Sequence, residues 1–224
     1  MTAFRPLMVA ILCAGALAAD PLADVLARMD KSAEKFKGMS AAITRDVYTA
    51  IMKDHNVHTG TIKFLRVKPG DVRVLIDFTG VDAQTVAMDG SKVSIYHPKA
   101  NVIQEYDIGG KRALIDQFFL LGFGAKSTEI AADYKVSYVG AEPIDGQATG
   151  HIALIPKSAE VLKQLKQADL WISDASGLPV QQKFILSADG DYQLATYSNV
   201  SLTPPSDQDL KLKVPKGVKT VKAN

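Results

Sequence analysis

From Gly38 onward the chain alternates apolar and polar residues over short runs, with turn signals close together between the runs. A period of two is typical of β-strands that bury one face. Asp89-Gly90, Asp145-Gly146 and Asp189-Gly190 favour the positive φ angles of tight hairpin turns, and Pro69-Gly70 and Ser176-Gly177 indicate two further reversals. The strand-like runs are 57–67, 72–78, 93–96, 102–106, 134–139, 152–155, 170–173, 180–186 and 192–202.

The connections between these runs are too short for a parallel sheet. Parallel neighbours need crossovers of a dozen or more residues, so the pattern predicts an antiparallel sheet of about eleven strands. The composition is compatible with one folded domain, because 47% of the 224 residues are hydrophobic and 22% are charged. Disorder and collagen-like order are therefore excluded.

Three segments are predicted to be helical, which makes the fold class α+β. A long N-terminal helix begins with Asp20 as N-cap and Pro21 at the first helical position, and it stops before Gly38. Residues 111–124 and 158–166 are expected to be helices inserted between strands. We see no linker or repeat, so residues 20–224 are predicted to form a single domain.

Residues 1–19 are predicted to be a secretory signal peptide. Arg5 gives the positive start, 7–17 is a short apolar run, and 16–18 has the small-x-small cleavage pattern. An apolar run of about eleven residues is well short of the roughly 20 that a membrane-spanning helix needs. Leu12, immediately before Cys13, disfavours a lipid-anchor pattern. We therefore expect an exported soluble protein.

Charge and side-chain chemistry exclude several classes of function. A formal charge of +2 is too small for nucleic-acid binding, and a single Cys excludes a disulfide scaffold or a Cys-based zinc site. Ser40 follows a helix and enters a strand, which is the reverse of a nucleophile elbow. His55 and His58 are interpreted as solvated turn residues, and His97 and His151 lack a partner at ligand spacing. The sequence therefore predicts no enzyme activity, no metal and no cofactor.

A curved antiparallel sheet with an apolar interior can serve to hold a ligand. Sheets of this kind leave an apolar cavity when helices cover their open face. They can equally be filled by their own side chains. Composition does not decide between the cavity and the filled core.

Four ordered motifs add a family resemblance. They are 68–73 (KPGDVR), 89–98 (DGSKVSIYHP), 154–157 (LIPK) and 214–218 (VPKGV). Their order and spacing resemble the periplasmic outer-membrane lipoprotein carriers, the LolA family, over nearly all of residues 20–224. The lipid-anchored receptor relatives are less similar, because the anchoring Cys pattern fails.

This resemblance implies an incomplete antiparallel β-barrel with lid helices over an apolar cavity. Such a protein is a monomeric periplasmic carrier, without cofactor or catalysis. It takes acylated lipoproteins from an ATP-driven inner-membrane exporter and transfers them to the outer membrane, to a receptor where one exists. The alternatives are a carrier of free lipid or another apolar ligand, and a non-catalytic envelope regulator or scaffold.

The resemblance also directs attention to particular side chains. In the family an Arg just before the Pro of the first motif latches the lid; here that position is Lys68, and Arg73 is the alternative cation. Replacing either by Leu is expected to impair release without unfolding the protein. The residues expected to cover acyl chains are Phe64, Val74, Ile76, Phe118, Phe119, Leu121, Phe123, Trp171, Phe184 and Tyr197.

Overall fold

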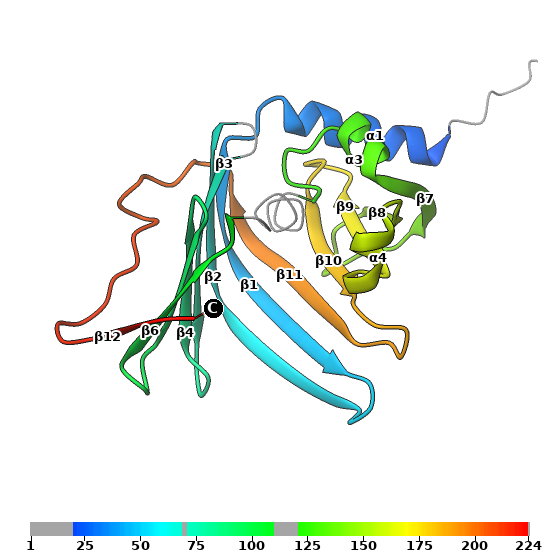
Figure 1. Ribbon diagram of the computed structural model, residues 1–224. Helices are drawn as coiled ribbons and strands as arrows, with labels where there is room; N and C mark the ends of the chain where they lie inside the picture. Colours follow the sequence, from blue (N-terminus) through cyan, green and yellow to red (C-terminus); the bar gives the residue numbers. More distant parts are fainter. Residues whose placement is uncertain (1–19, 69–70, 110–120, 224) are drawn as a thin grey trace, which may run out of the picture.

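The computed structural model describes residues 20–68, 71–109 and 121–223, and in these residues one large curved sheet carries a few helices (Figure 1). The helices are α1 (Pro21–Ala33), α3 (Ser127–Asp133) and α4 (Ala159–Gln164). The strands are β1 (Gly38–Thr49), β2 (Asp54–Lys68), β3 (Asp71–Thr79), β4 (Gln84–Asp89), β5 (Lys92–His97), β6 (Val102–Asp107), β7 (Tyr134–Ala141), β8 (Thr149–Pro156), β9 (Gln167–Ser173), β10 (Pro179–Ile185), β11 (Tyr192–Ser201) and β12 (Lys219–Lys222).

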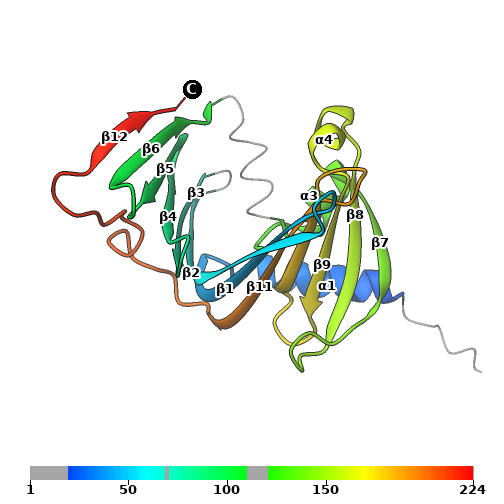
Figure 2. The same ribbon diagram turned by 90° about the horizontal axis from the view of Figure 1, so that it is seen from below.

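The strands form a single sheet that does not close. Their order is β12-β6-β5-β4-β3-β2-β1-β11-β10-β9-β8-β7, so β12 and β7 are its two free edges. Seen from below, the sheet curves so that the β3–β6 part and the β7–β10 part lie on opposite sides of its concave face (Figure 2). The predicted fold class, an incomplete β-barrel of the α+β class, is confirmed.

One edge of the sheet differs from the prediction. β12 pairs with β6 in parallel, with Lys219 opposite Val102, so the sheet is not antiparallel throughout. The long stretch between β11 and β12 permits this, because a parallel pairing requires a connection of a dozen or more residues. β1 and β4 were also absent from the strand-like runs.

The helix signals are confirmed at two of the three predicted segments. Asp20 caps α1 by accepting a hydrogen bond from the Leu22 amide at 3.0 Å, and Pro21 is its first residue. Ser158 caps α4. α3 was not predicted. The predicted signal peptide, 1–19, and most of the predicted helix at 111–124 lie outside the described residues.

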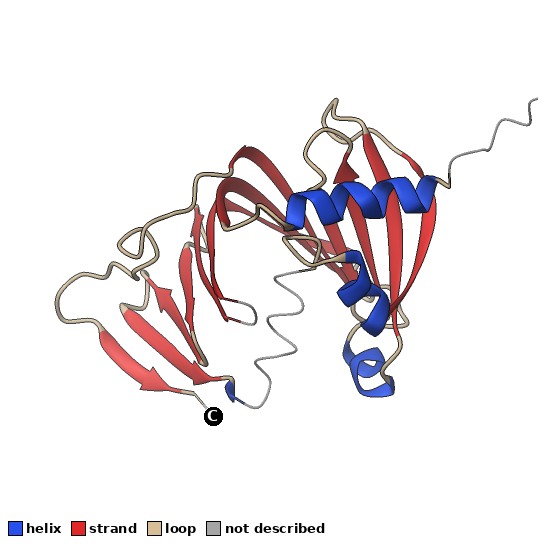
Figure 3. Cartoon of the chain, turned by 90° about the horizontal axis from the view of Figure 1, so that it is seen from above, coloured by secondary structure: helices blue, strands red, loops and turns tan. Residues whose placement is uncertain are grey.

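α1 lies across the β7–β10 half of the sheet (Figure 3). The turn between β9 and β10 shows how closely it approaches: Gly177 has a φ of +68°, and a Cβ there would lie 2.3 Å from the Arg28 carbonyl oxygen. The predicted Ser176-Gly177 turn therefore needs its glycine, because the backbone there has a positive φ and because α1 leaves no room for a side chain. No helix in the described ranges is long and apolar enough to cross a membrane.

Candidate ligand cavity

The inner face of β1 to β5, β10 and β11 encloses an apolar cavity. Along β3, Val72, Val74 and Ile76 are buried and alternate with residues of the outer face, as the period of two requires. The cavity has a volume of about 720 Å³. Its apolar lining is Met39, Ile43, Ile62, Phe64, Val74, Ile76, Phe78, Val86, Met88, Val93, Ile95, Ile108, Phe123, Phe184, Leu186 and Ala195, and its polar lining is Arg45, Tyr106, Gln164, Gln182, Gln193 and Tyr197.

Six of the ten residues predicted to cover acyl chains line this cavity, and they come from five separate segments of the chain. Alternation along the strands brings them together from positions far apart in sequence. They are Phe64, Val74, Ile76, Phe123, Phe184 and Tyr197. Phe118 and Phe119 lie outside the described residues.

Two predicted residues are placed elsewhere. Leu121 belongs to the second core cluster, together with Val25 and Met29 of α1. Trp171 is wrongly assigned to the cavity: its neighbour Leu170 is buried in that second cluster, so Trp171 points to the opposite face of β9. There its ring stacks on His151 with centroids 4.2 Å apart, and its Nε1 donates a hydrogen bond to Glu142 at 2.7 Å.

A buried hydrogen-bonded chain ties the segment after residue 120 to the cavity wall. The Tyr197 hydroxyl donates to Gln182 Oε1 at 2.6 Å, and Gln182 Nε2 donates to the carbonyl oxygen of Leu121. Burial raises the pKa of Tyr197 well above its ordinary value. These three groups satisfy one another, so this polar chain is a structural part of the wall.

Arg45 is a cavity-wall residue that the sequence analysis missed. It lies on β1 opposite His58 of β2 and Ala195 of β11. Its guanidinium carbon is 5.6 Å from the centre of the Phe78 ring, and burial lowers the pKa of the side chain. The signal was present, since 41, 43, 45 and 47 alternate along one strand face and only position 45 is charged.

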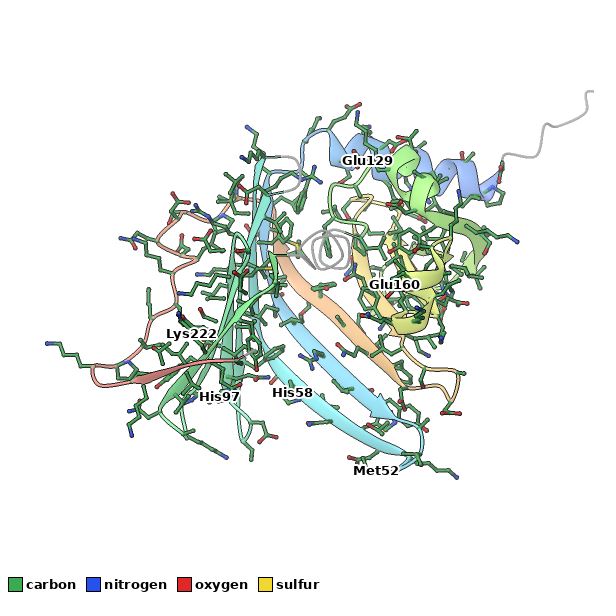
Figure 4. All side chains as sticks on the ribbon, in the orientation of Figure 1. Met52, His58, His97, Glu129, Glu160 and Lys222 are labelled. Carbon is green, nitrogen blue, oxygen red and sulfur yellow. The ribbon has the colours of Figure 1, made fainter. Side chains whose placement is uncertain are left out.

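The histidine interpretation is wrong for His58. Both His55 and His58 lie in β2 rather than in a turn, and they point to opposite faces. His55 is exposed and its Nδ1 lies 2.8 Å from Asp46 Oδ2. His58 is buried on the inner face, with its ring 5.6 Å from that of Phe78 (Figure 4). In the described part of the chain, no group of three or more His, Cys, Asp or Glu could hold a metal.

The two candidate latch cations are placed differently from each other. Arg73 lies on the outer face of β3, where it pairs with Asp89 at 3.0 Å and Asp207 at 2.9 Å, so it does not face the cavity. Lys68 is exposed at the end of β2, and its role as a latch stays a prediction. Two residues earlier, Arg66 packs on the segment after residue 120: a Cβ on Gly124 would lie 3.2 Å from its guanidinium carbon.

Neither a protein-family model nor a curated protein matches this sequence. Solved structures do match. An uncharacterized conserved protein from Thermus thermophilus is 11% identical, with 91% of this chain and 100% of that chain covered at a TM-score of 0.53. MucB is 15% identical, with 85% of this chain and 62% of that chain covered at a TM-score of 0.50. MucB from Pseudomonas aeruginosa is also known in complex with MucA.

A LolA superfamily protein, NE2245 from Nitrosomonas europaea, is 12% identical, with 85% of this chain and 97% of that chain covered at a TM-score of 0.40. The first two matches, at 11% and 15% identity, show that the chain shares their fold. The chain spans 62% of the length of MucB. Fold and site together define an open α+β barrel with an internal apolar cavity.

Proposed function

We propose that this protein is a non-enzymatic periplasmic carrier that holds the acyl chains of lipoproteins in its cavity and transfers them from the inner to the outer membrane. The single observation that carries this proposal is the apolar cavity of about 720 Å³. Small-molecule sites typically measure about 300–1,000 Å³ and are mostly apolar. Its partners would be acylated lipoproteins, an ATP-driven inner-membrane exporter and an outer-membrane receptor.

The physical chemistry of acyl chains explains why such a cavity is needed. Each buried methylene contributes about 0.8 kcal/mol, so a chain of about sixteen carbons gains on the order of 12 kcal/mol by leaving water. A soluble carrier must therefore shield most of the acyl chain from water, as the membrane interior does. Sixteen apolar side chains around one cavity supply cover of that kind.

A carrier of free lipid is the second candidate, and one observation favours it. Among the described residues that line the cavity, Arg45 is the one charged residue, and it lies in a wall of mostly apolar side chains. The acyl end of a lipoprotein has no acidic group to place there, whereas fatty acids and phospholipids do. The two candidates share the cavity and differ in the head of the ligand.

Recovery of the protein from its native periplasm tests the proposal. Mass spectrometry of the material bound to the purified full chain should show an acylated protein or, for the second candidate, free lipid. The control is Ala195→Phe, which places a large ring in the cavity and should reduce the recovered acyl material. A stable protein partner with no acyl group, in wild type and variant alike, would instead identify a regulator or scaffold.

A further inference from the structure

We propose that the ligand of the cavity carries an acid group, either carboxylate or phosphate, and that the guanidinium of Arg45 binds it inside the cavity. This inference rests on the proposed acyl-binding cavity and favours the second candidate, a carrier of free lipid, because the acyl end of a lipoprotein has no acid group. It goes further by assigning the chemistry of the ligand's head and the residue that recognises it.

The first argument is the state of the Arg45 side chain. Among the described residues, no carboxylate pairs with it, and its Nε is buried without a hydrogen-bond partner. Arg28 and Arg66 also have a buried Nε without a partner, but neither of them lines the cavity. Arg28 pairs with Asp174 at 2.8 Å, and Arg73 pairs with Asp89 and Asp207. A cation withdrawn from water costs free energy unless an anion or hydrogen-bond acceptors compensate. In the described part of the chain, the half-buried Arg45 guanidinium therefore faces the cavity without an anionic partner.

The second argument is what surrounds the guanidinium. The Phe78 ring lies 5.6 Å from its carbon and offsets part of the cost of burial, but a ring face accepts no directed hydrogen bond from the five N–H donors. His58 lies directly opposite Arg45 on β2, with its ring centre 5.6 Å from that of Phe78. The planar guanidinium fork matches a carboxylate or a phosphate with two parallel hydrogen bonds.

The third argument is the position of Arg45 relative to the apolar lining. On β1 it follows Ile43, and beyond it the strand continues through Val47 toward its end at Thr49. Ile43 pairs with Gly60 and with Tyr197, so the apolar part of the cavity begins immediately beside the guanidinium. A ligand with an acid head and an apolar tail matches this arrangement, in which the guanidinium lies next to the apolar lining.

Three ligands with one tail test the inference: dodecanoate, dodecyl phosphate and dodecanol. Their affinities are measured by displacement of the neutral fluorescent probe N-phenyl-1-naphthylamine from the full chain. Wild type should bind at least one acid about 10- to 100-fold more tightly than the alcohol, as expected for charge-assisted hydrogen bonds. Preference for dodecanoate would indicate a fatty acid, and preference for dodecyl phosphate would indicate a phospholipid-type head.

Arg45→Met is the decisive variant, and Lys63→Met is its control. Lys63 lies on the outer face of β2, so the same exchange there leaves the cavity unchanged. Arg45→Met should bind dodecanol as wild type does and lose the preference for acids, and Lys63→Met should keep it. Without ligand, the melting temperature of Arg45→Met should equal or exceed that of wild type, since an uncompensated cation is removed; a lower value would indicate a structural role instead.

The failures are distinguishable. Equal binding of the alcohol and both acids by wild type, or an undiminished acid preference in Arg45→Met, would overturn the inference and leave the acyl carrier intact. If wild type binds none of the three ligands, the proposed function itself is contradicted.

Discussion

Both halves of the sheet have buried apolar residues on their inner faces, but among the described residues only the β1–β5 half opens onto the large apolar cavity. In the β7–β9 half, Val25 and Met29 of α1 and Ile130 of α3 pack on Ile152 and Leu154, which are fully buried. In the β1–β5 half, comparable residues surround a cavity of about 720 Å³. Among the described elements, the amphipathic helix α1 lies across the β7–β10 half. An apolar strand face becomes packed core or ligand site according to what covers it.

The largest expected effect contrasts isoleucines on the two inner faces. Ile152→Ala, in the packed half, should lower the free energy of unfolding by about 3–5 kcal/mol, because many packed atoms lose contacts. Ile76→Ala, in the cavity wall, should cost about 2 kcal/mol, since part of that side chain already faces empty space. Urea unfolding of both variants checks this. Equal losses would mean that the two halves are packed alike.

A second matched pair enlarges alanines instead. Ala168→Phe, where Ala168 is fully buried in the packed half, should cost about 1–3 kcal/mol through overpacking. Ala195→Phe should leave stability within about 0.5 kcal/mol, because the ring enters the cavity, and should weaken acyl ligand binding about tenfold or more. Chemical denaturation and probe displacement measure the two quantities. A severe loss of stability in Ala195→Phe would argue against an open cavity.

Alkaline pH should affect the packed half through Tyr134. Burial raises the pKa of this phenol to about 12, above its ordinary value, and the hydroxyl is buried without a partner. The unfolded chain therefore loses this proton first, so stability falls as the pH rises above about 10 and continues to fall up to about 12. Between pH 7 and pH 11, the free energy of unfolding of wild type should fall by about 1.4 kcal/mol more than that of Tyr134→Phe. Identical pH profiles in denaturant titrations would contradict this.

The smallest effect is expected on the outer face. Arg73→Leu removes two ion pairs with exposed carboxylates and should cost at most about 1 kcal/mol. It should leave acyl transfer unchanged, because Arg73 does not line the cavity.

Lys68 is the remaining candidate latch. Lys68→Leu should slow release of the acyl ligand and leave the stability of the protein unchanged. Impaired acyl transfer in Arg73→Leu, with normal transfer in Lys68→Leu, would instead identify Arg73 as the latch.

Local patterns predicted most of the elements, although not β1, β4 and α3, because strand alternation, turn dipeptides and helix caps act over a few residues. Asp20, Ser158 and the Ser176-Gly177 turn are found where the sequence placed them. The parallel β12–β6 pairing was missed, since it depends on contacts between residues more than a hundred positions apart.

The site was predicted only in part, because the face that a side chain occupies depends on register and on cover. Trp171 was expected to cover acyl chains, yet the neighbouring Leu170 takes the core side of β9. Arg45 was passed over as one charge among many. The choice between cavity and filled core also could not be made from period alone, since both require the same alternation.

The most direct test of the acyl cavity follows isoleucine methyl groups by NMR during titration with dodecanoate. Methyl resonances of Ile43, Ile62 and Ile76 should shift as ligand is added, because these residues line the cavity. The shifts should reach a plateau and give the same dissociation constant for all three residues. Those of Ile152 and Ile172, buried under α1 and α3, should stay in place. Shifts confined to the second group, or no shift in either group at saturating ligand, would contradict an acyl-binding cavity in this half of the sheet.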